Sequence, residues 1–322
     1  TLTEAQALAD AGGRRREGSV KVVFVRHAEA LHNVQEEGWK ERDPPLTAQG
    51  EADAAALRAD PALAALARPL LVVVSPLRRA LQTAVLGFGG ECRFLADPGL
   101  QETSDCPRDL GRPRDVLAAE FPGVDFSRLG GDTWFEASQQ QNKWARVARF
   151  KAWCAGCQED EIAVVGHHDV CKAMFGVSLD NGDFFTAVLD RATLEWRPCD
   201  YTGRNPRTLE WTAKKGSGDG IRALLAGRGA AELAALDLGS GWPMLHYAAY
   251  SGNHGAVRAL LRCRADASFA GSDGLTARDW AGRRGMDEAL KALEEEEALR
   301  APEKGVEEAA AAAPAAHAPA AV

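Results

Sequence analysis

Three short, mainly apolar runs, all rich in β-branched residues, constrain the fold of this chain more than any other feature. They cover residues 20–25, 70–74 and 162–165. Runs of this length are typical of strands that are buried on both faces of a mainly parallel sheet. Segments with helical patterns lie between them, at residues 47–66, 76–88 and 134–153. Strands that alternate with helices predict an α/β domain with three layers, in which helices cover both faces of the sheet.

The limits of this domain follow from the segments on either side. Two further short strands are expected at residues 187–189 and 193–197, and with them the α/β domain spans residues 19–203. Residues 1–18 are polar and carry no apolar stripe. We therefore expect an N-terminal extension ahead of the domain.

Histidines and arginines follow the predicted strands at the points where the strands end. Arg26 and His27 end the first strand, Arg79 comes shortly after the second, and His167 ends the third. The carboxyl ends of parallel strands meet at one edge of a sheet, where open α/β folds bind ligands. Two imidazoles and two guanidinium groups at one edge predict a pocket for a phosphate dianion.

The second half of the chain contains a repeat of about 33 residues, a step that belongs to helix-turn-helix repeats. Residues 241–249, GWPMLHYAA, and the turns after them closely resemble an ankyrin repeat, and residues 206–238 and 272–297 look like degenerate flanking copies. We expect about three ankyrin repeats over residues 204–298, forming a smaller, all-α domain that packs on the α/β domain and can bind a protein partner. The Ala/Pro-rich residues 299–322 predict a disordered tail.

Four segments, in order along the chain, carry a family resemblance. They are residues 25–29 (VRHAE, with Asn33), 45–50 (PLTAQG), 75–84 (SPLRRALQTA) and 164–167 (VVGH). They resemble the motifs of the histidine phosphatase, or phosphoglycerate mutase-like, superfamily, over roughly residues 19–200. Residues 105–111 and 120–126 are similar to its fungal and plant phosphatase-like branch, and not to the glycolytic mutases. The resemblance implies a three-layer α/β/α phosphoglycerate mutase-like domain.

This resemblance also implies an activity and a set of site residues. A member of this family would hydrolyse a phosphorylated substrate through a phosphohistidine, without a metal or a cofactor. The implied residues are His27 as nucleophile, Arg26, Arg79 and His167 as phosphate ligands, Asn33 as a further donor and Glu102 as proton donor, with His27, Glu102 and His167 as the catalytic group. The chemistry agrees, because a neutral imidazole can attack phosphorus while fixed cations meet the developing charge. A protonated carboxyl group can supply the proton that an alkoxide leaving group needs.

Some positions depart from the family pattern. Ala30 stands where a hydroxyl residue is common, and His168 and Asp169 replace the small residues that usually follow the second histidine. We interpret Asp169 as the N-cap of the next helix, because Asp is a good cap. If it entered the pocket instead, it would repel phosphate. We interpret His32 as a rim residue and His246 as a structural residue of the ankyrin turn.

The sequence leaves the substrate class and two alternative functions open. Specificity candidates lie between residues 102 and 144, namely Arg112, Arg114, Arg128 and Trp134. One alternative is a phosphatase-fold interaction protein with weak or no catalysis, in which the ankyrin surface does the work. A phosphoglycerate mutase is the less favoured alternative, because no insertion resembles the mutase substrate loops.

Composition and charge exclude several other classes. The chain has 322 residues, which favours two domains, and no apolar run approaches the ~20 residues of a membrane span. The net charge is -8, of which residues 287–308 contribute -6, so the rest lacks the basic field of a nucleic-acid binder. Seven cysteines favour an intracellular, cytoplasmic protein over a disulfide framework, and we interpret Cys154 and Cys157 as the end of a helix and not as a zinc site. Because the chain begins at Thr1, a targeting segment ahead of it stays open.

Overall fold

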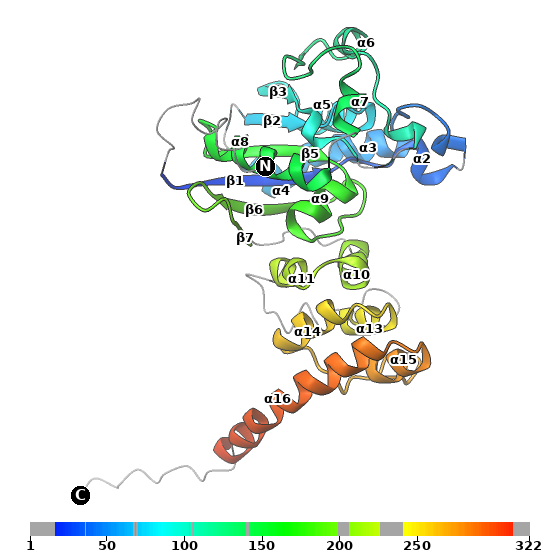
Figure 1. Cartoon of the computed structure of the whole chain (residues 1–322), viewed down its shortest axis with the longest axis vertical. Coiled ribbons are helices and arrows are strands. Elements are labelled where there is room, and N and C mark those ends of the chain that lie inside the picture. The colour runs from blue at the N-terminus through cyan, green and yellow to red at the C-terminus, as the bar shows by residue number, and fades with distance from the viewer. Residues whose placement is uncertain are drawn as a thin grey trace, which may run out of the picture.

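The computed structural model shows an α/β domain at one end of an elongated molecule and a stack of helices at the other (Figure 1). It describes residues 17–35, 37–66, 68, 70–102, 104, 106–139, 142–198, 206–225 and 241–311. Most of the expected N-terminal extension, residues 1–16, lies outside this range, as do residues 199–205 at the expected domain boundary. No helix among the described residues is long and apolar enough to cross a membrane.

The α/β domain is built on a seven-stranded sheet with the order β4-β3-β2-β5-β1-β6-β7. The strands are β1 Ser19–Arg26, β2 Leu70–Val74, β3 Cys92–Ala96, β4 Val124–Asp125, β5 Glu161–Gly166, β6 Phe184–Asp190 and β7 Trp196–Pro198. Strands β4, β3, β2, β5 and β1 are parallel, whereas β6 is antiparallel to β1 and β7. Arg26 pairs with Gly166, and Val74 with Val165, so β1, β5 and β2 end at the same edge. The apolar runs thus form the three central strands, as the sequence predicts.

Helices cover both faces of this sheet, which confirms the predicted three layers. Alternate residues of a strand point to opposite faces. Val22 and Phe24 of β1 belong to a core with α8 and α9, whereas Val23 and Val25 belong to a core with α5. The helices of this domain are α2 Leu31–Val34, α3 Ala48–Ala56, α4 Pro61–Ala64, α5 Arg78–Phe88, α6 Arg114–Glu120, α7 Trp134–Gln139, α8 Lys143–Gly156 and α9 His168–Phe175.

Two of the predicted helical segments are divided in the structure. The segment at 47–66 breaks before α4, because the Asp60 side chain accepts hydrogen bonds from the first turn of α4 and Pro61 occupies its first position. The segment at 134–153 breaks before α8, where Asn142 is the N-cap. Helix α8 ends at Gly156, so Cys154 and Cys157 lie at a helix end in the core, as interpreted from the sequence.

The second domain is a stack of helix pairs. Its described helices are α10 Pro206–Lys215, α11 Gly218–Leu225, α13 Met244–Tyr250, α14 His254–Arg262, α15 Ala277–Arg283 and α16 Asp287–Ala311. Helix α13 lies between α10 and α15, and α14 between α11 and α16, so successive helix pairs pack on one another, as in a repeat stack. In the first turn of α13, His246 donates from Nε2 to the Leu275 carbonyl at 3.0 Å, which confirms its structural role.

Helix α16 differs from the predicted start of a disordered tail at residue 299. It continues to Ala311, and residues 312–322 lie outside the described range. Alanine, glutamate and leucine are strong helix formers, and extending an existing helix needs no new nucleus. The acidic run in α16 is neutralised locally: Glu294 and Glu297 pair with Arg278, Glu295 with Arg258 and Glu296 with Arg262.

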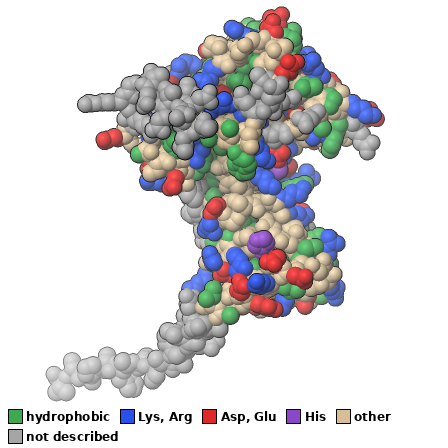
Figure 2. All heavy atoms as spheres, in the orientation of Figure 1, with side chains coloured by type: hydrophobic (Ala, Val, Ile, Leu, Met, Phe, Trp, Pro, Cys, Tyr) green, Lys and Arg blue, Asp and Glu red, His purple; other side chains and the backbone are tan. Residues whose placement is uncertain are grey.

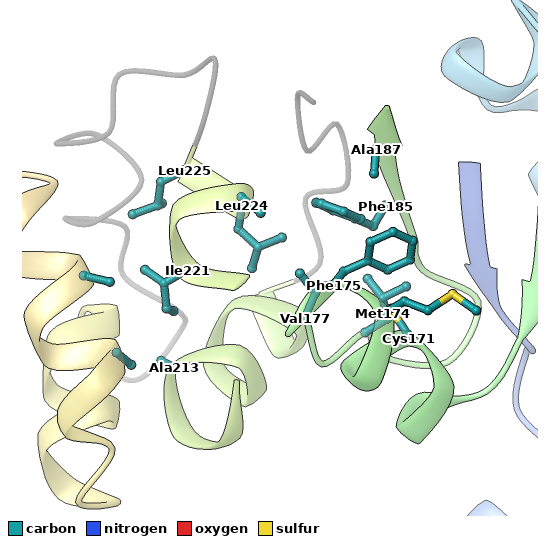
Figure 3. Packing of buried hydrophobic residues seen from close by; sticks show 14 of the residues in the cluster. Cys171, Met174, Phe175, Val177, Phe185, Ala187, Ala213, Ile221, Leu224 and Leu225 are labelled. Carbon is teal, nitrogen blue, oxygen red and sulfur yellow. The ribbon is translucent and has the colours of Figure 1, made fainter. Parts of the chain in front are cut away.

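The stack packs on the α/β domain, as predicted. One continuous apolar core runs from the sheet through α9 and α11 to α16. Phe175 and Phe185 face Leu224 across this junction (Figure 3). The backbones also meet closely, because a Cβ on Gly220 would lie 2.1 Å from the Gly176 carbonyl oxygen. Gly176 has φ +71°, a conformation that favours glycine, at the end of α9.

Candidate active site

The two predicted catalytic histidines meet at the carboxyl edge of the sheet. His27 follows β1 and His167 follows β5, its parallel neighbour. Their ring centroids are 5.1 Å apart, and both side chains are buried, with exposed fractions of 2% and 0%. Two residues far apart in the sequence are thus neighbours because their strands are.

The hydrogen bonds of His27 leave one nitrogen with a lone pair. Nδ1 lies 2.7 Å from the Ala28 carbonyl oxygen. A carbonyl oxygen only accepts hydrogen bonds, so Nδ1 carries the hydrogen and Nε2 does not. Burial, together with the nearby positive charge of Arg79, lowers the pKa of His27 well below its ordinary value. The imidazole is therefore neutral at physiological pH, in the tautomer that a nucleophile needs.

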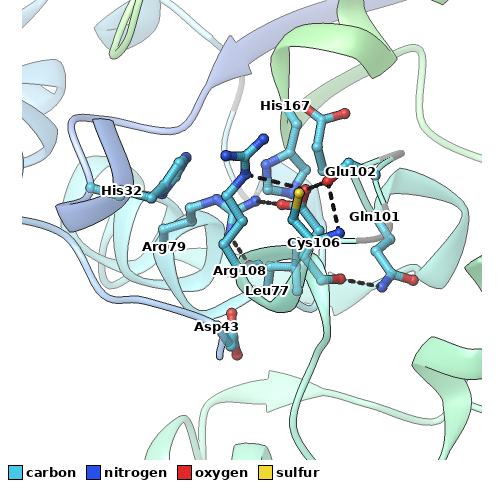
Figure 4. A network of polar contacts seen from close by, with 12 residues as sticks. His32, Asp43, Leu77, Arg79, Gln101, Glu102, Cys106, Arg108 and His167 are labelled. Atoms are coloured by element: carbon cyan, nitrogen blue, oxygen red, sulfur yellow. Dashed lines mark hydrogen bonds and ion pairs between the residues drawn. The ribbon is translucent and has the colours of Figure 1, made fainter. Parts of the chain in front are cut away.

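Arg79 is held by Arg108 and Asp109, in the loop after β3, and His167 is held by Ser75, which directly follows β2. The side chain of Arg79, 1% exposed, donates to the Asp109 carboxylate at 2.7 Å and to the Arg108 carbonyl at 2.8 Å. Nε2 of His167 lies 2.8 Å from the Ser75 hydroxyl oxygen. Burial and the charge of Arg79 lower the pKa of His167 as well. Figure 4 shows Arg79, Arg108, Glu102 and His167 converging, with Asp43 below them.

Several buried polar atoms of this cluster have no hydrogen-bond partner among the described residues. They are Nε of Arg26, Nε of Arg79, Nδ1 of His167, Nδ1 of His32 and a terminal nitrogen of Arg108. Buried polar groups normally find a partner, so such a group of atoms is expected to be satisfied by a ligand or by water. Because these atoms belong to cationic or imidazole side chains, the ligand that suits them is an anion.

Asn33 and Glu102 complete the predicted set. The Asn33 side-chain oxygen accepts from the Ala30 amide at 2.9 Å, which leaves its NH₂ group as the donor to a ligand. Glu102 accepts from the Asp169 amide at 3.3 Å. The turn that carries Glu102 is held by Gln101, which donates to the Asp109 carbonyl and accepts from Arg146, both at 2.7 Å.

These residues surround a cavity of about 740 Å³, large enough for a ligand much bigger than inorganic phosphate. Five of the six predicted residues line it, namely Arg26, His27, Asn33, Arg79 and Glu102. His167 is completely buried beside His27 and is not part of the lining. The structure therefore brings the predicted residues together, with His167 one layer deeper than the others.

Comparison with known proteins identifies the family. A model of the histidine phosphatase superfamily (branch 1) matches residues 22–213. This chain belongs to the histidine phosphatase superfamily. A model of ankyrin repeats in three copies matches residues 209–300, so this histidine phosphatase chain also carries ankyrin repeats, and the two matches overlap within α10.

Relatives of this chain are named as phosphatases or as mutase-like proteins. A probable phosphatase of Schizosaccharomyces pombe is 33% identical over 37% of this chain and 57% of its own length, so the chain spans little more than half of that relative. A phosphoglycerate mutase-like protein of Arabidopsis thaliana is 31% identical over 58% of this chain and 92% of its own. The solved structure of the α-ribazole phosphatase of Shigella flexneri is 22% identical over 52% and 90% of the two chains, with a TM-score of 0.35.

Of the interpretations of Asp169 and His32, the first is wrong and the second is confirmed. The N-cap of α9 is His167, and Asp169 instead accepts from Nδ1 of His168 at 3.0 Å and lines the cavity. This hydrogen bond lowers the pKa of Asp169, which therefore carries a negative charge in the pocket. His32 does lie at the rim, where burial and nearby arginines lower its pKa to about 3.

The specificity candidates from the sequence, Arg112, Arg114, Arg128 and Trp134, do not line the cavity. Trp134 is buried and donates from its indole to the Arg112 carbonyl at 2.9 Å, and Arg128 pairs with Asp97 at 2.9 Å. These residues pack the domain.

Sequence reasoning missed Arg108, Asn181 and one face of α10, all of which line the cavity. Arg108 lies six residues after Glu102 in the sequence and could have been suspected as a cation near it. No sequence signal indicates Asn181, whose NH₂ donates to the His27 carbonyl at 3.0 Å.

Proposed function

We propose that this chain is a metal-independent phosphomonoesterase that acts through a phosphohistidine on His27. The observation that carries the proposal is the buried, neutral His27, with Nδ1 tied to the Ala28 carbonyl, beside Arg26 and Arg79 on one cavity wall. The arginines offer fixed positive charge for the equatorial phosphate oxygens, the task that a metal ion performs in other phosphoryl-transfer enzymes.

In the first step, Nε2 of His27 attacks phosphorus, a P–N bond forms and the P–O bond to the leaving group breaks. Glu102, in its acid form, gives a proton to the departing oxygen. Arg26, Arg79 and Asn33 hold the phosphoryl oxygens. A bound dianion raises the pKa of a neighbouring imidazole, so His167 takes up a proton when phosphate arrives and gains a charge that matches it.

In the second step, water attacks the phosphohistidine. Glu102, now a carboxylate, takes a proton from that water, the P–N bond breaks and inorganic phosphate leaves. The same carboxyl group thus serves as acid and then as base, and His27 returns to its neutral tautomer.

The phosphohistidine gives the direct test. Rapid quenching with a labelled phosphate ester should trap an acid-labile, base-stable phosphoprotein on the full chain. His27→Ala should form none, whereas His254→Ala, which changes an exposed histidine at the start of α14, should label as the unmodified chain does. Labelling of His27→Ala equal to that of the unmodified chain would place the nucleophile elsewhere.

The role of Glu102 is tested by leaving-group dependence. Glu102→Gln should lower turnover of alkyl phosphates by about 10²–10⁴-fold, the usual contribution of general acid catalysis, and turnover of p-nitrophenyl phosphate far less. The reason is that only a basic alkoxide needs the proton. Equal losses for both esters would remove Glu102 from this role.

A second candidate function is a phosphatase-fold interaction protein with weak turnover. The specific observation in its favour is the ionised Asp169 on the cavity wall, which repels a phosphate dianion. In that function the ankyrin stack, a module suited to protein partners, would be the working surface. Asp169→Asn separates the two: a rise of tenfold or more in kcat/KM from a barely measurable level supports the weak enzyme, and an already efficient unmodified chain excludes it.

A further inference from the structure

The cavity has a second wall that comes from the first helix of the stack. Arg207, Glu210, Trp211 and Lys215 of α10 line it together with the His27 cluster. Glu210 and Trp211 lie three and four residues after Arg207, and Lys215 lies four residues after Trp211, so all four share one face of the helix. Figure 2 shows the surface hollowed between the α/β domain and the stack, with basic side chains at its margin.

The opposite face of α10 fixes its position relative to His27. Thr208 and Thr212 are completely buried and accept from the amides of Asp180 and Ser178, at 2.9 and 3.1 Å. Thr208 also donates to the carboxylate of Asp183.

The loop bonded to α10, residues 178–183, also forms hydrogen bonds with Arg26 and His27. The Leu179 carbonyl accepts from Arg26 at 2.8 Å, and Asn181 contacts the His27 carbonyl. The wall and the nucleophile are therefore attached to the same short loop and keep a fixed distance.

Trp211 is the largest group on this wall. Its side chain is 39% exposed, although an indole gains free energy when its faces are covered. The Lys215 ammonium lies 4.3 Å from its ring centroid. A second exposed indole, Trp39 at 54%, lines the cavity with the Arg108 guanidinium 4.1 Å from its ring. The cavity thus offers aromatic surface, with a cation over one face of each ring.

The acids of this wall have basic partners of their own. Glu210 pairs with Lys214, which lies over Tyr247 and outside the cavity lining, and Asp180 lies 3.9 Å from Arg207. Lys215 therefore keeps its charge toward the cavity beside Trp211.

We propose that α10 forms a leaving-group subsite for phosphate esters of flat aromatic groups. The phosphate would lie at His27, the ring would pack on Trp211, and an anionic substituent on the ring would pair with Lys215. This inference rests on the proposed phosphomonoesterase function and adds the class of substrate. The cavity volume fits it, because a phosphate alone would leave most of the 740 Å³ unfilled.

The test compares 2-naphthylmethyl phosphate with ethyl phosphate. Both release a primary alcohol, so they differ mainly in the aromatic ring. Trp211→Ala should lower kcat/KM about tenfold for the naphthylmethyl ester, as expected when one stacking contact is lost, and leave ethyl phosphate within twofold. Trp211→Phe should retain most of the preference. Trp144→Ala is the matched control, because Trp144 is 58% exposed and lies outside this cavity lining.

Lys215 is tested with a charged ring. The unmodified chain should prefer 4-carboxybenzyl phosphate over benzyl phosphate, and Lys215→Gln should reduce that preference about two- to fivefold, the range of an exposed ion pair. If Trp211→Ala changes both esters equally or neither, the subsite proposal is overturned while the phosphatase proposal stands.

A binding measurement separates the two proposals if turnover is absent. Calorimetry of the full chain with 2-naphthylmethyl phosphate needs no chemistry, and Trp211→Ala should weaken this binding about tenfold. Lack of turnover for every ester then refutes only the proposed phosphomonoesterase activity. If the unmodified chain and Trp211→Ala bind this ester with equal affinity, only the proposed subsite is refuted.

Discussion

Replacing Asp109 with asparagine should destabilise the fold and tighten phosphate binding at the same time. Asp109 and Arg79 form an ion pair in which both side chains are 1% exposed. The substitution keeps the shape of the side chain and removes its charge, so Arg79 stays buried without its paired carboxylate, beside Arg26 and Arg108. Breaking a buried pair in this way costs about 3–5 kcal/mol.

The size of both effects can be worked out. Asparagine keeps one acceptor oxygen, so we take the lower value of about 3 kcal/mol, which corresponds to a fall in Tm of about 6–12 °C for a unit of this size. Phosphate would restore a counter-charge to Arg79, and we expect it to bind Asp109→Asn about tenfold more tightly. At a saturating phosphate concentration, this tenfold gain returns about 1.4 kcal/mol, roughly half of the loss.

Thermal melts followed by circular dichroism, with and without phosphate, measure both quantities. Asp97→Asn is the control, because Asp97 pairs with Arg128 at 2.9 Å away from the cavity lining. Its destabilisation should not change when phosphate is added. A Tm of Asp109→Asn equal to that of the unmodified chain, or a difference in Tm that phosphate leaves unchanged, would refute the reasoning about Arg79.

Two further predictions concern pH and the junction. The pKa values of His27 and His167 are lowered in the folded chain, so below pH 6.5 the unfolded chain binds more protons than the folded chain. For these two groups together, the free energy of unfolding should therefore decrease by up to about 2.7 kcal/mol for each unit by which the pH is lowered below 6.5. Urea unfolding between pH 7.5 and 5.5 measures this slope, and a flat profile would contradict the buried neutral histidines. Gly220→Ala places a Cβ 2.1 Å from the Gly176 carbonyl oxygen, so it should lower the free energy of unfolding by about 1–3 kcal/mol, measured as a lower urea midpoint. Gly282→Ala, whose Cβ meets no atom within 4 Å, should leave the midpoint unchanged.

The convergence of the site could be predicted because it follows from topology alone. Arg26, His27 and His167 end parallel strands, and parallel strands bring their carboxyl ends to one edge whatever the loops do. Strand β3 was missed because its half-exposed face and Arg93 interrupt the apolar run that buried strands show. It lies near the edge of the sheet, next to the two-residue β4, where it is less buried and does not need a continuous apolar sequence.

The partner of Arg79 and the second wall of the cavity could not be predicted. Asp109 lies in a loop without periodicity, and its pairing with Arg79 depends on the path of that loop over the sheet. Trp211 reaches the cavity because Thr208 and Thr212 anchor α10 on the loop after α9. Such contacts depend on how two domains dock, which no local pattern in either domain records. The register of the ankyrin helices, by contrast, follows from repeats that stack on their neighbours.

The close approach of Gly176 and Gly220 has a consequence for whatever the stack holds. Close contact between the two backbones restricts rotation of the stack relative to the α/β domain. The row of helices from α10 to α16 therefore extends away from His27 in one direction. A macromolecule seated on the stack would bring only those phosphate groups to the cavity that lie at one reach and one angle from its point of attachment. Stiff tethering of this kind gives a high effective concentration at a single distance and almost none at others. The stack would then work as a ruler, selecting sites by position along the bound chain as well as by chemistry.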